Sequence, residues 1–98
     1  MQTERWPLTI HTPVGPQHGI VHLRQAAGGW EGEAIGGGQS LPLRTLVREG
    51  NRMTWTQHLF GPLRFPMRFD VTIIDDQLSG SARAGWLPPS HVSGKRLP

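Results

Sequence analysis

Strict alternation of apolar and polar residues runs through most of this chain. Successive side chains of a β-strand point to opposite faces, so a repeat of two predicts strands with one buried face. A helical repeat is nearly absent, and the one stretch that would admit a short helix, residues 41–49, contains Pro42. The chain is therefore expected to be all-β. The alternating segments are residues 6–10, 20–24, 53–59, 65–73 and 78–86.

Short breaks rich in Gly, Pro, Asn and Asp separate these segments. They fall at residues 12–16, 27–29, 36–38, 49–51, 60–62, 75–76 and 88–89. These residue types favour tight turns. The breaks imply about eight short strands. No break is long enough for the crossover that connects parallel strands, so neighbouring strands are expected to be antiparallel.

A sheet with one apolar face would leave that face in water if it stayed flat. Closure into a barrel buries the face and removes the sheet edges. We therefore predict a small eight-stranded antiparallel up-and-down β-barrel that forms a single domain over residues 1–98, with a two-sheet sandwich as the alternative. A barrel of this size is either filled by side chains or holds one small ligand.

The turn positions also predict which residues face each other across neighbouring strands. A two-residue loop is expected at residues 75–76, a three-residue loop at residues 49–51, and a longer first turn at residues 12–16. The predicted pairs are Ile73–Leu78, Phe69–Ala82, Trp55–Phe69, Gln57–Met67, Trp6–Leu23, His11–His18, Val47–Met53 and Thr45–Trp55.

Composition narrows the classes of protein. The chain has 98 residues and no Cys, which excludes disulfides, thiolate nucleophiles and Cys-ligated metals. No apolar run approaches the roughly 20 residues of a spanning helix, and residues 1–10 lack the layout of a secretion signal. A cytoplasmic protein that does not bind membranes is therefore expected.

Basic residues exceed acidic ones, which raises nucleic acid as a partner. The formal net charge is +3 and the pI is about 11.1. The arginines are, however, scattered singly along the chain, and no stretch concentrates them. We therefore expect them on the outer face and predict no nucleic-acid partner.

The pattern resembles the calycin-type meander barrels, the broad group of lipocalins and avidins, in a short form. It is also similar to a group of small bacterial β-barrel proteins, known mainly as uncharacterised, over residues 6–10, 50–57, 78–85 and 87–96. The resemblance implies the barrel fold but carries no catalytic motif. The chain lacks the lipocalin Gly-x-Trp near its start, the lipocalin helix after the strands and the polar residues with which avidins bind biotin.

Aromatic and Met side chains dominate the predicted inner face. Large flat rings and flexible thioethers suit an apolar or aromatic guest, although they also fill a small barrel. The small residues Gly80, Ala82 and Ala84 leave inner volume and favour a cavity. The predicted ligand-binding residues are Trp6, Trp30, Met53, Trp55, Gln57, Phe65, Met67, Phe69 and Trp86.

Gln57 is the strongly polar residue of this inner face, with Thr45 as a lesser companion. A buried amide needs hydrogen-bond partners, which are the backbone, a water molecule or a guest. His58 and His91 are predicted at the barrel rim, and with Gln57 they are the candidate catalytic residues. No nucleophile elbow accompanies them, so the sequence leaves open whether the protein is an enzyme.

The remaining His and Glu residues indicate no metal or cofactor. His18 and His22 would lie about 13 Å apart along a strand, too far for one ion. His11 and His18 are expected to be exposed neighbours, and Glu31 and Glu33 to share a solvated face. No metal site and no cofactor are predicted.

Three functions fit this sequence. The first is binding of a small apolar or aromatic molecule inside the barrel, and the second is an isomerase or cyclase that acts on an apolar metabolite. The third is a packed structural or interaction module. Ile20, Leu46 and Ile74 are expected on the outer face, where they would favour a homodimer.

Overall fold

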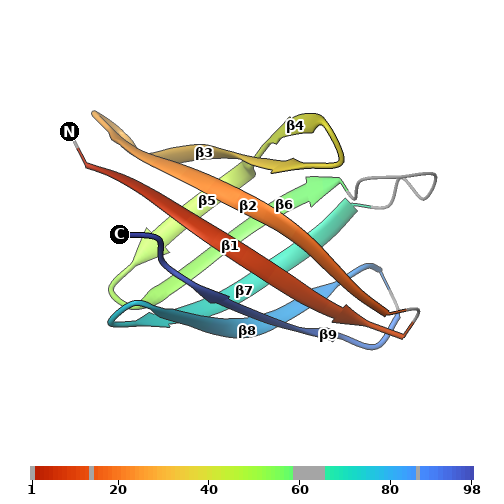
Figure 1. Ribbon diagram of the computed structural model, residues 1–98. Coiled ribbons are helices and arrows are strands. Elements are labelled where there is room, and N and C mark those ends of the chain that lie inside the picture. Colours follow the sequence, from red (N-terminus) through yellow and green to blue (C-terminus); the bar gives the residue numbers. More distant parts are fainter. Residues whose placement is uncertain (1, 14, 59–65, 86) are drawn as a thin grey trace.

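The computed structural model describes residues 2–13, 15–58, 66–85 and 87–98 and folds them into one antiparallel sheet of nine strands (Figure 1). The order across the sheet is β4-β3-β2-β1-β9-β8-β7-β6-β5, so the chain forms a meander in which β1 and β9 also pair. The strands are β1 (Thr3–Thr12), β2 (Gly15–Ala26), β3 (Gly29–Gly36), β4 (Gln39–Pro42), β5 (Arg44–Glu49), β6 (Arg52–His58), β7 (Pro66–Ile74), β8 (Gln77–Arg83) and β9 (Ser90–Lys95).

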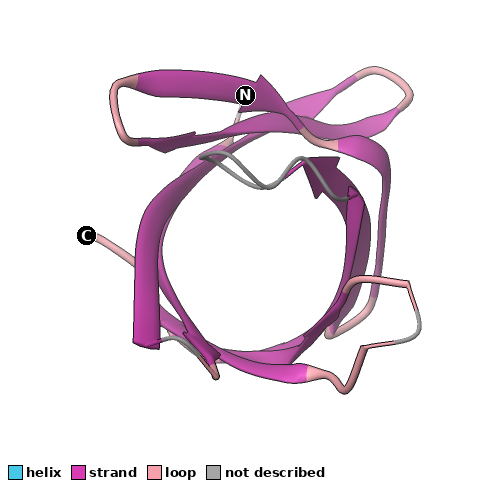
Figure 2. Cartoon of the chain, turned by 90° about the vertical axis from the view of Figure 1, so that its right-hand side faces the viewer, coloured by secondary structure: helices cyan, strands magenta, loops and turns pink. Residues whose placement is uncertain are grey.

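The sheet curls into a barrel, which Figure 2 shows as a ring seen end-on. Its two outermost strands, β4 and β5, follow each other in the chain and are joined through Leu43. The backbone N–H of Leu43 donates to the carbonyl oxygen of Gly32 in β3 at 3.0 Å, and β5 also contacts β3. Residues 39–49 therefore close the barrel by pairing with β3 in their first part and with β6 in their second.

The predicted all-β antiparallel barrel is confirmed, with nine strands in place of eight. The additional strand arises because the segment expected as one strand is broken at Leu43. Just beyond the break, Thr45 has a φ of +50°, and the register with β6 shifts between Arg44 and Val47. Such a bulge bends a strand, which here allows the chain to change its pairing partner. Because all nine strands belong to one continuous sheet, the sandwich alternative is not what forms.

Four of the predicted cross-strand pairs are confirmed. They all involve β6, β7 and β8, where the two-residue loop at residues 75–76 fixes the β7–β8 register. An Asp75 φ of +56° fits the tight turn at this loop. The confirmed pairs are Ile73–Leu78, Phe69–Ala82, Trp55–Phe69 and Gln57–Met67.

The predicted register of the first hairpin is wrong by two residues. Trp6 lies opposite Val21 rather than Leu23. Thr12 pairs directly with Gly15, whose φ is +112°, so the two strands extend into the break expected at residues 12–16. A shift of two keeps every side chain on its predicted face, because the strand repeat is also two.

The register between β5 and β6 is wrong by one residue. Glu49 pairs with Arg52 across a two-residue loop at residues 50–51, so Arg48 and not Val47 lies opposite Met53. Gly50 has a φ of +58°, which suits the tighter turn. The expected Val47–Met53 pair does not form.

This one-residue difference reverses the faces of β5. Val47 is 49% exposed, while Leu46, expected outside, packs against the core. Thr45 is exposed rather than inside, so the expected Thr45–Trp55 pair is also wrong. Ile74 lies on the outer face as predicted and is 61% exposed. Leu46 was also expected there, but it packs against the core.

The apolar faces of the strands meet in one core inside the barrel. Its largest fully buried side chains include Trp6, Trp55 and Phe69, each 1% exposed. The rings of Trp55 and Phe69 stack with centroids 4.7 Å apart and planes 4° from parallel. Within the described part of the chain, no helix is long and apolar enough to cross a membrane.

Candidate functional site

Gln57 lies inside the barrel, as predicted, and is 5% exposed. Its side-chain oxygen Oε1 accepts a hydrogen bond from the indole Nε1 of Trp55 at 2.8 Å. The two residues are two positions apart in β6, so their side chains share the inner face. Among the described residues, this is the hydrogen bond that fixes the orientation of the Gln57 amide.

A small cavity adjoins Gln57. Its volume is about 30 Å³, and its lining includes Leu8, Ile10, Ala34, Gln57 and Phe69. This is room for about one water molecule, whereas a cavity of about 150 Å³ is known to take a benzene ring. The cavity therefore presents the polar amide of Gln57 among mostly apolar side chains, but it is too small for an aromatic ring.

Most of the predicted ligand-binding residues that the structure describes build the core. Phe69 and Gln57 line the small cavity; Trp30 is half-buried. Phe65 and Trp86 lie outside the described residues. The remaining members of the set fill the interior with side chains at most 4% exposed, and they are Trp6, Met53, Trp55 and Met67.

A buried ion pair, not anticipated from the sequence, lies in the barrel near the β1 end that carries Glu4. The Glu4 side chain is 3% exposed, and its Oε1 accepts hydrogen bonds from Trp6 Nε1 at 2.9 Å and from an Arg48 guanidinium nitrogen at 3.0 Å. The guanidinium carbon of Arg48 also lies 4.4 Å from the centre of the Trp30 ring. The one sequence sign of this cluster is that Glu4 continues the inner-face repeat of Trp6.

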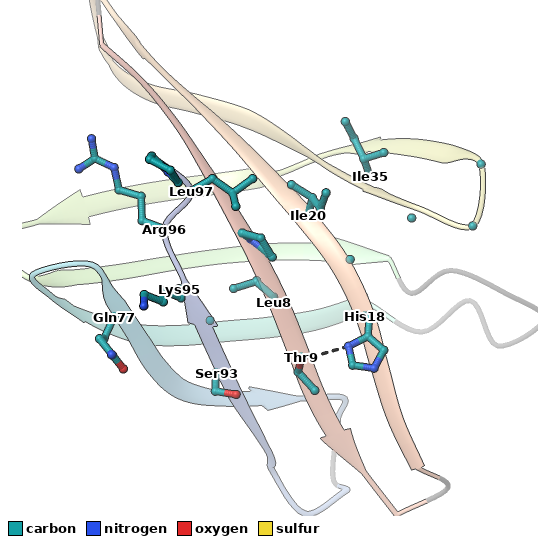
Figure 3. Close-up of a pocket in the computed structure, with 17 residues that line it drawn as sticks. Leu8, Thr9, His18, Ile20, Ile35, Gln77, Ser93, Lys95, Arg96 and Leu97 are labelled. Atoms are coloured by element: carbon teal, nitrogen blue, oxygen red, sulfur yellow. Dashed lines mark hydrogen bonds between the residues drawn. The ribbon is translucent and has the colours of Figure 1, made fainter.

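An apolar row lies on the outer face of the sheet. Pro7 pairs with Ile20, and Ile20 pairs with Ile35, so these three residues cross β1, β2 and β3 side by side. The tail after β9 runs beside them, because the N–H of Leu97 donates to the carbonyl oxygen of Arg5 at 2.9 Å. Ile20, Ile35 and Leu97 line one shallow groove with a volume of about 1000 Å³. Figure 3 shows these residues as sticks.

The rim of this groove is polar and basic. Lys95 and Arg96 line it beside the tail, and His18 lines it on β2, where its Nδ1 lies 3.1 Å from the hydroxyl of Thr9 (Figure 3). Among the described residues that line the groove, none has an acidic side chain. The groove therefore joins an apolar floor to cationic groups.

The candidate catalytic residues are not brought together. His58 ends β6 as an exposed residue, and His91 lies exposed on the outer face of β9, whereas Gln57 points inside. On the β9 side His11 pairs with His91, and their ring centroids lie 5.6 Å apart. On the β2 side His11 lies opposite Pro16, so the expected His11–His18 pair is wrong. In the chain as described, no three His, Asp or Glu residues form a group that could hold a metal ion.

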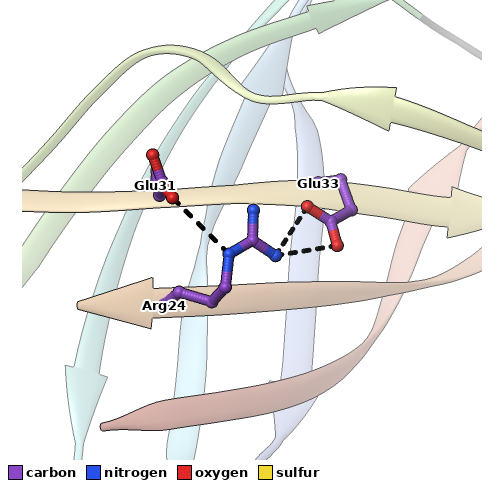
Figure 4. A network of polar contacts seen from close by, with 3 residues as sticks. All are labelled: Arg24, Glu31 and Glu33. Atoms are coloured by element: carbon purple, nitrogen blue, oxygen red, sulfur yellow. Dashed lines mark hydrogen bonds and ion pairs between the residues drawn. The ribbon is translucent and has the colours of Figure 1, made fainter. Parts of the chain in front are cut away.

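Glu31 and Glu33 share one face of β3, as predicted, and an arginine of β2 bridges them (Figure 4). A guanidinium nitrogen of Arg24 donates to both carboxylate oxygens of Glu33 at 2.9 Å, and its Nε lies 3.6 Å from Glu31. The hydrogen bond to Glu33 is the main reason that the pKa of Arg24 is raised. The two carboxylates therefore form an ion-pair network.

Asp70 and Arg52 form a bidentate ion pair on the outer face of β6 and β7, with distances of 3.0 and 2.7 Å. The hydrogen bonds from Arg52 hold the pKa of Asp70 below its ordinary value. A carboxyl whose pKa is lowered by folding stabilises the fold above its unfolded pKa, and this contribution disappears as the pH falls through the folded value.

We expect Asp70→Asn to lower the free energy of unfolding at pH 7 by less than about 1 kcal/mol, because the pair is exposed. The difference from the wild type should shrink as the solution is acidified below the ordinary pKa of Asp and as salt is added. Urea unfolding at several pH values measures it. A difference that grows on acidification would contradict the assigned role of Arg52.

The chain matches no protein-family model, and comparison with curated proteins and with solved structures found no match. The resemblance to calycin-type barrels therefore stays a prediction beyond the barrel architecture itself.

Proposed function

We propose that this barrel binds a small apolar or aromatic molecule that carries an acidic group, and that it does so in the outer groove. The row formed by Pro7, Ile20 and Ile35 carries the proposal, because it places three apolar residues side by side across three strands of the outer face. Contiguous apolar surface beside polar residues is typical of ligand sites.

The charges around the groove support an acidic group on the guest. Lys95 and Arg96 provide two cations near the tail, and His18 offers a ring nitrogen farther along β2. A carboxylate or sulfonate would form charge-assisted hydrogen bonds with the cations while its apolar body lies on the isoleucines. The absence of acidic side chains among the described lining residues favours an anion over a cation.

A second proposed site is the interior beside Gln57, which is the site predicted from the sequence. Its support is the Gln57 amide, which lines the small cavity and whose oxygen accepts a hydrogen bond from Trp55. A guest larger than water must displace the side chains around the cavity of about 30 Å³. The outer groove needs no such rearrangement.

The test uses the fluorescent probe 8-anilinonaphthalene-1-sulfonate, an aromatic anion of the proposed class. We expect saturable binding to the folded wild type and about tenfold weaker binding to Ile35→Ser, because the loss of apolar contact amounts to about 1.4 kcal/mol. Lys95→Ala should weaken binding mainly at low salt. Ile74→Ser is the matched control, since Ile74 is an outward isoleucine that is 61% exposed and does not line the groove.

The variants distinguish the outer groove from the interior site. Weaker binding to Gln57→Leu with no change in Ile35→Ser would move the site into the barrel. An equal loss in Ile74→Ser and Ile35→Ser, or no saturable binding by the wild type, would overturn the groove proposal. Thermal unfolding of every variant is the measurement that checks whether the fold is retained.

A further inference from the structure

Three arginines that are far apart in the sequence share one register row on the outer face. Arg44 of β5 pairs with Thr56 of β6, Thr56 pairs with Arg68 of β7, and Arg68 pairs with Arg83 of β8. Figure 1 shows these four strands side by side. Because neighbouring strands lie about 5 Å apart, the row spans about 15 Å of backbone.

These arginines are exposed and are not neutralised by direct contacts. The ion pairs of the described residues involve Arg24, Arg48 and Arg52, whereas Arg44, Arg68 and Arg83 take part in none. Like charges directly opposite each other in a sheet are destabilising, and Arg68 and Arg83 are such a pair. A row that costs stability in the free protein is more easily explained if an anion covers it.

The surface beside the row is hollowed and rich in hydroxyl groups. A depression of about 510 Å³ is lined by Arg68 and Arg83 together with Thr54, Thr56 and Ser81. Asp70 also lines it, with its carboxylate held in the ion pair with Arg52. Arginine guanidinium groups and Ser or Thr hydroxyls are among the groups that contact phosphate oxygens in protein–DNA complexes. The groups around the depression therefore match a phosphate-bearing ligand.

The bulge of β5 lies at the edge of the same depression. Thr45 lines it with a φ of +50°, which is rare for a β-branched residue, and the register shift starts at Arg44. Bulges re-aim side chains next to binding sites, and strained residues gather at such places. The strained backbone of Thr45 therefore lies next to Arg44, the residue at the β5 end of the arginine row.

The charge balance of this face is positive. It carries Arg44, Arg52, Arg68 and Arg83 against Glu49 and Asp70, so two positive charges remain. Arg44, Arg68 and Arg83 are scattered along the sequence, but the strand register brings them together on one face of the folded barrel. We propose that the outer face of β5–β8 binds the phosphodiester backbone of double-stranded nucleic acid without reading its base sequence.

The described side chains favour a duplex over a single strand. Sequence-tolerant binding of single strands uses exposed aromatic rings on which bases stack. Trp55 and Phe69, the aromatic residues that line the depression, are each 1% exposed and point inside. Binding through cationic and hydroxyl groups alone depends on the density of phosphate charges along the nucleic acid, which is higher in a duplex than in a single strand.

The test is fluorescence anisotropy with a dye-labelled DNA duplex of mixed sequence and about 20 base pairs, titrated with the full chain at several salt concentrations. Each phosphate that a protein neutralises contributes about −0.9 to the slope of log K against log salt, so three arginines should give a slope near −2.7. Arg68→Ala should reduce the size of the slope by about 0.9 and weaken binding at low salt about tenfold.

Two matched variants separate a local site from overall charge. Arg5→Ala removes the same charge from β1, which is separated from β7 by β9 and β8, and should leave the slope unchanged. Asp70→Asn releases Arg52 from its ion pair and should make the slope steeper and the binding tighter. These opposite effects come from surface residues that leave the core intact.

Three outcomes would overturn the proposal. One is no binding of the duplex at low salt, and another is an equal effect of Arg5→Ala and Arg68→Ala. The third is binding of heparin or of phosphatidylserine vesicles at protein concentrations where the duplex does not bind. Because the groove variants Ile35→Ser and Lys95→Ala do not touch this face, failure here leaves the proposed small-molecule site standing.

Discussion

Glu4→Ala is expected to destabilise the barrel by about 3 kcal/mol. The variant leaves the guanidinium of Arg48 inside the barrel without its carboxylate, and it removes the acceptor of the Trp6 indole. Removal of one partner from a buried pair usually costs about 3–5 kcal/mol. Arg48 keeps 17% of its side-chain surface exposed, which places the effect at the lower end.

A double variant distinguishes this cost from a simple loss of packing. Glu4→Leu combined with Arg48→Met should recover most of the stability, because an apolar pair of similar volume needs no charge compensation. Urea unfolding with an unchanged m-value measures both effects. If Glu4→Leu alone is as stable as the double variant, the ion pair does not hold Arg48 in place.

Gly80→Ala is expected to cost about 3 kcal/mol, at the upper end for overpacking. An added Cβ would overlap the carbonyl oxygen of Asp70 and would lie 2.6 Å from the Cα of Val71. Both obstacles are backbone atoms of β7, the strand that pairs with β8 here, so no side-chain rotation relieves them. Thermal unfolding should show a large fall in melting temperature.

Gly28→Ala is the control for this substitution. Gly28 has no atom within 4 Å of an added Cβ, and its φ lies outside the left-handed region. There an alanine reduces the freedom of the unfolded chain and should stabilise the protein by about 0.4–1 kcal/mol. Equal effects at positions 28 and 80 would show that β7 and β8 are not as close as described.

The face of most side chains could be predicted from the sequence because it depends only on a repeat of two. The first hairpin shows how robust this is, since an error of two residues in its register left Trp6 inside. The β5–β6 turn shows the opposite case. There an error of one residue reversed the strand, and Arg48 entered the core while Val47 left it.

Contacts between distant segments could not be predicted from the alternation. The Glu4–Arg48 pair depends on how the barrel closes, and the row of Arg44, Arg68 and Arg83 depends on three separate strand registers. The size of the interior was also out of reach. Gln57 was correctly placed inside, but the volume left beside it is the small difference between a filled and a hollow barrel.

The pairing of β1 with β9 has a consequence for how the chain folds. Leu8 and Gly94 face each other across this pair, although almost the whole sequence separates them. During synthesis, β1 and β2 can form their hairpin early, but the other side of β1 must wait until residues 91–94 have emerged. Contacts between such distant residues slow folding, and until they form, β1 presents an open strand edge to other nascent chains.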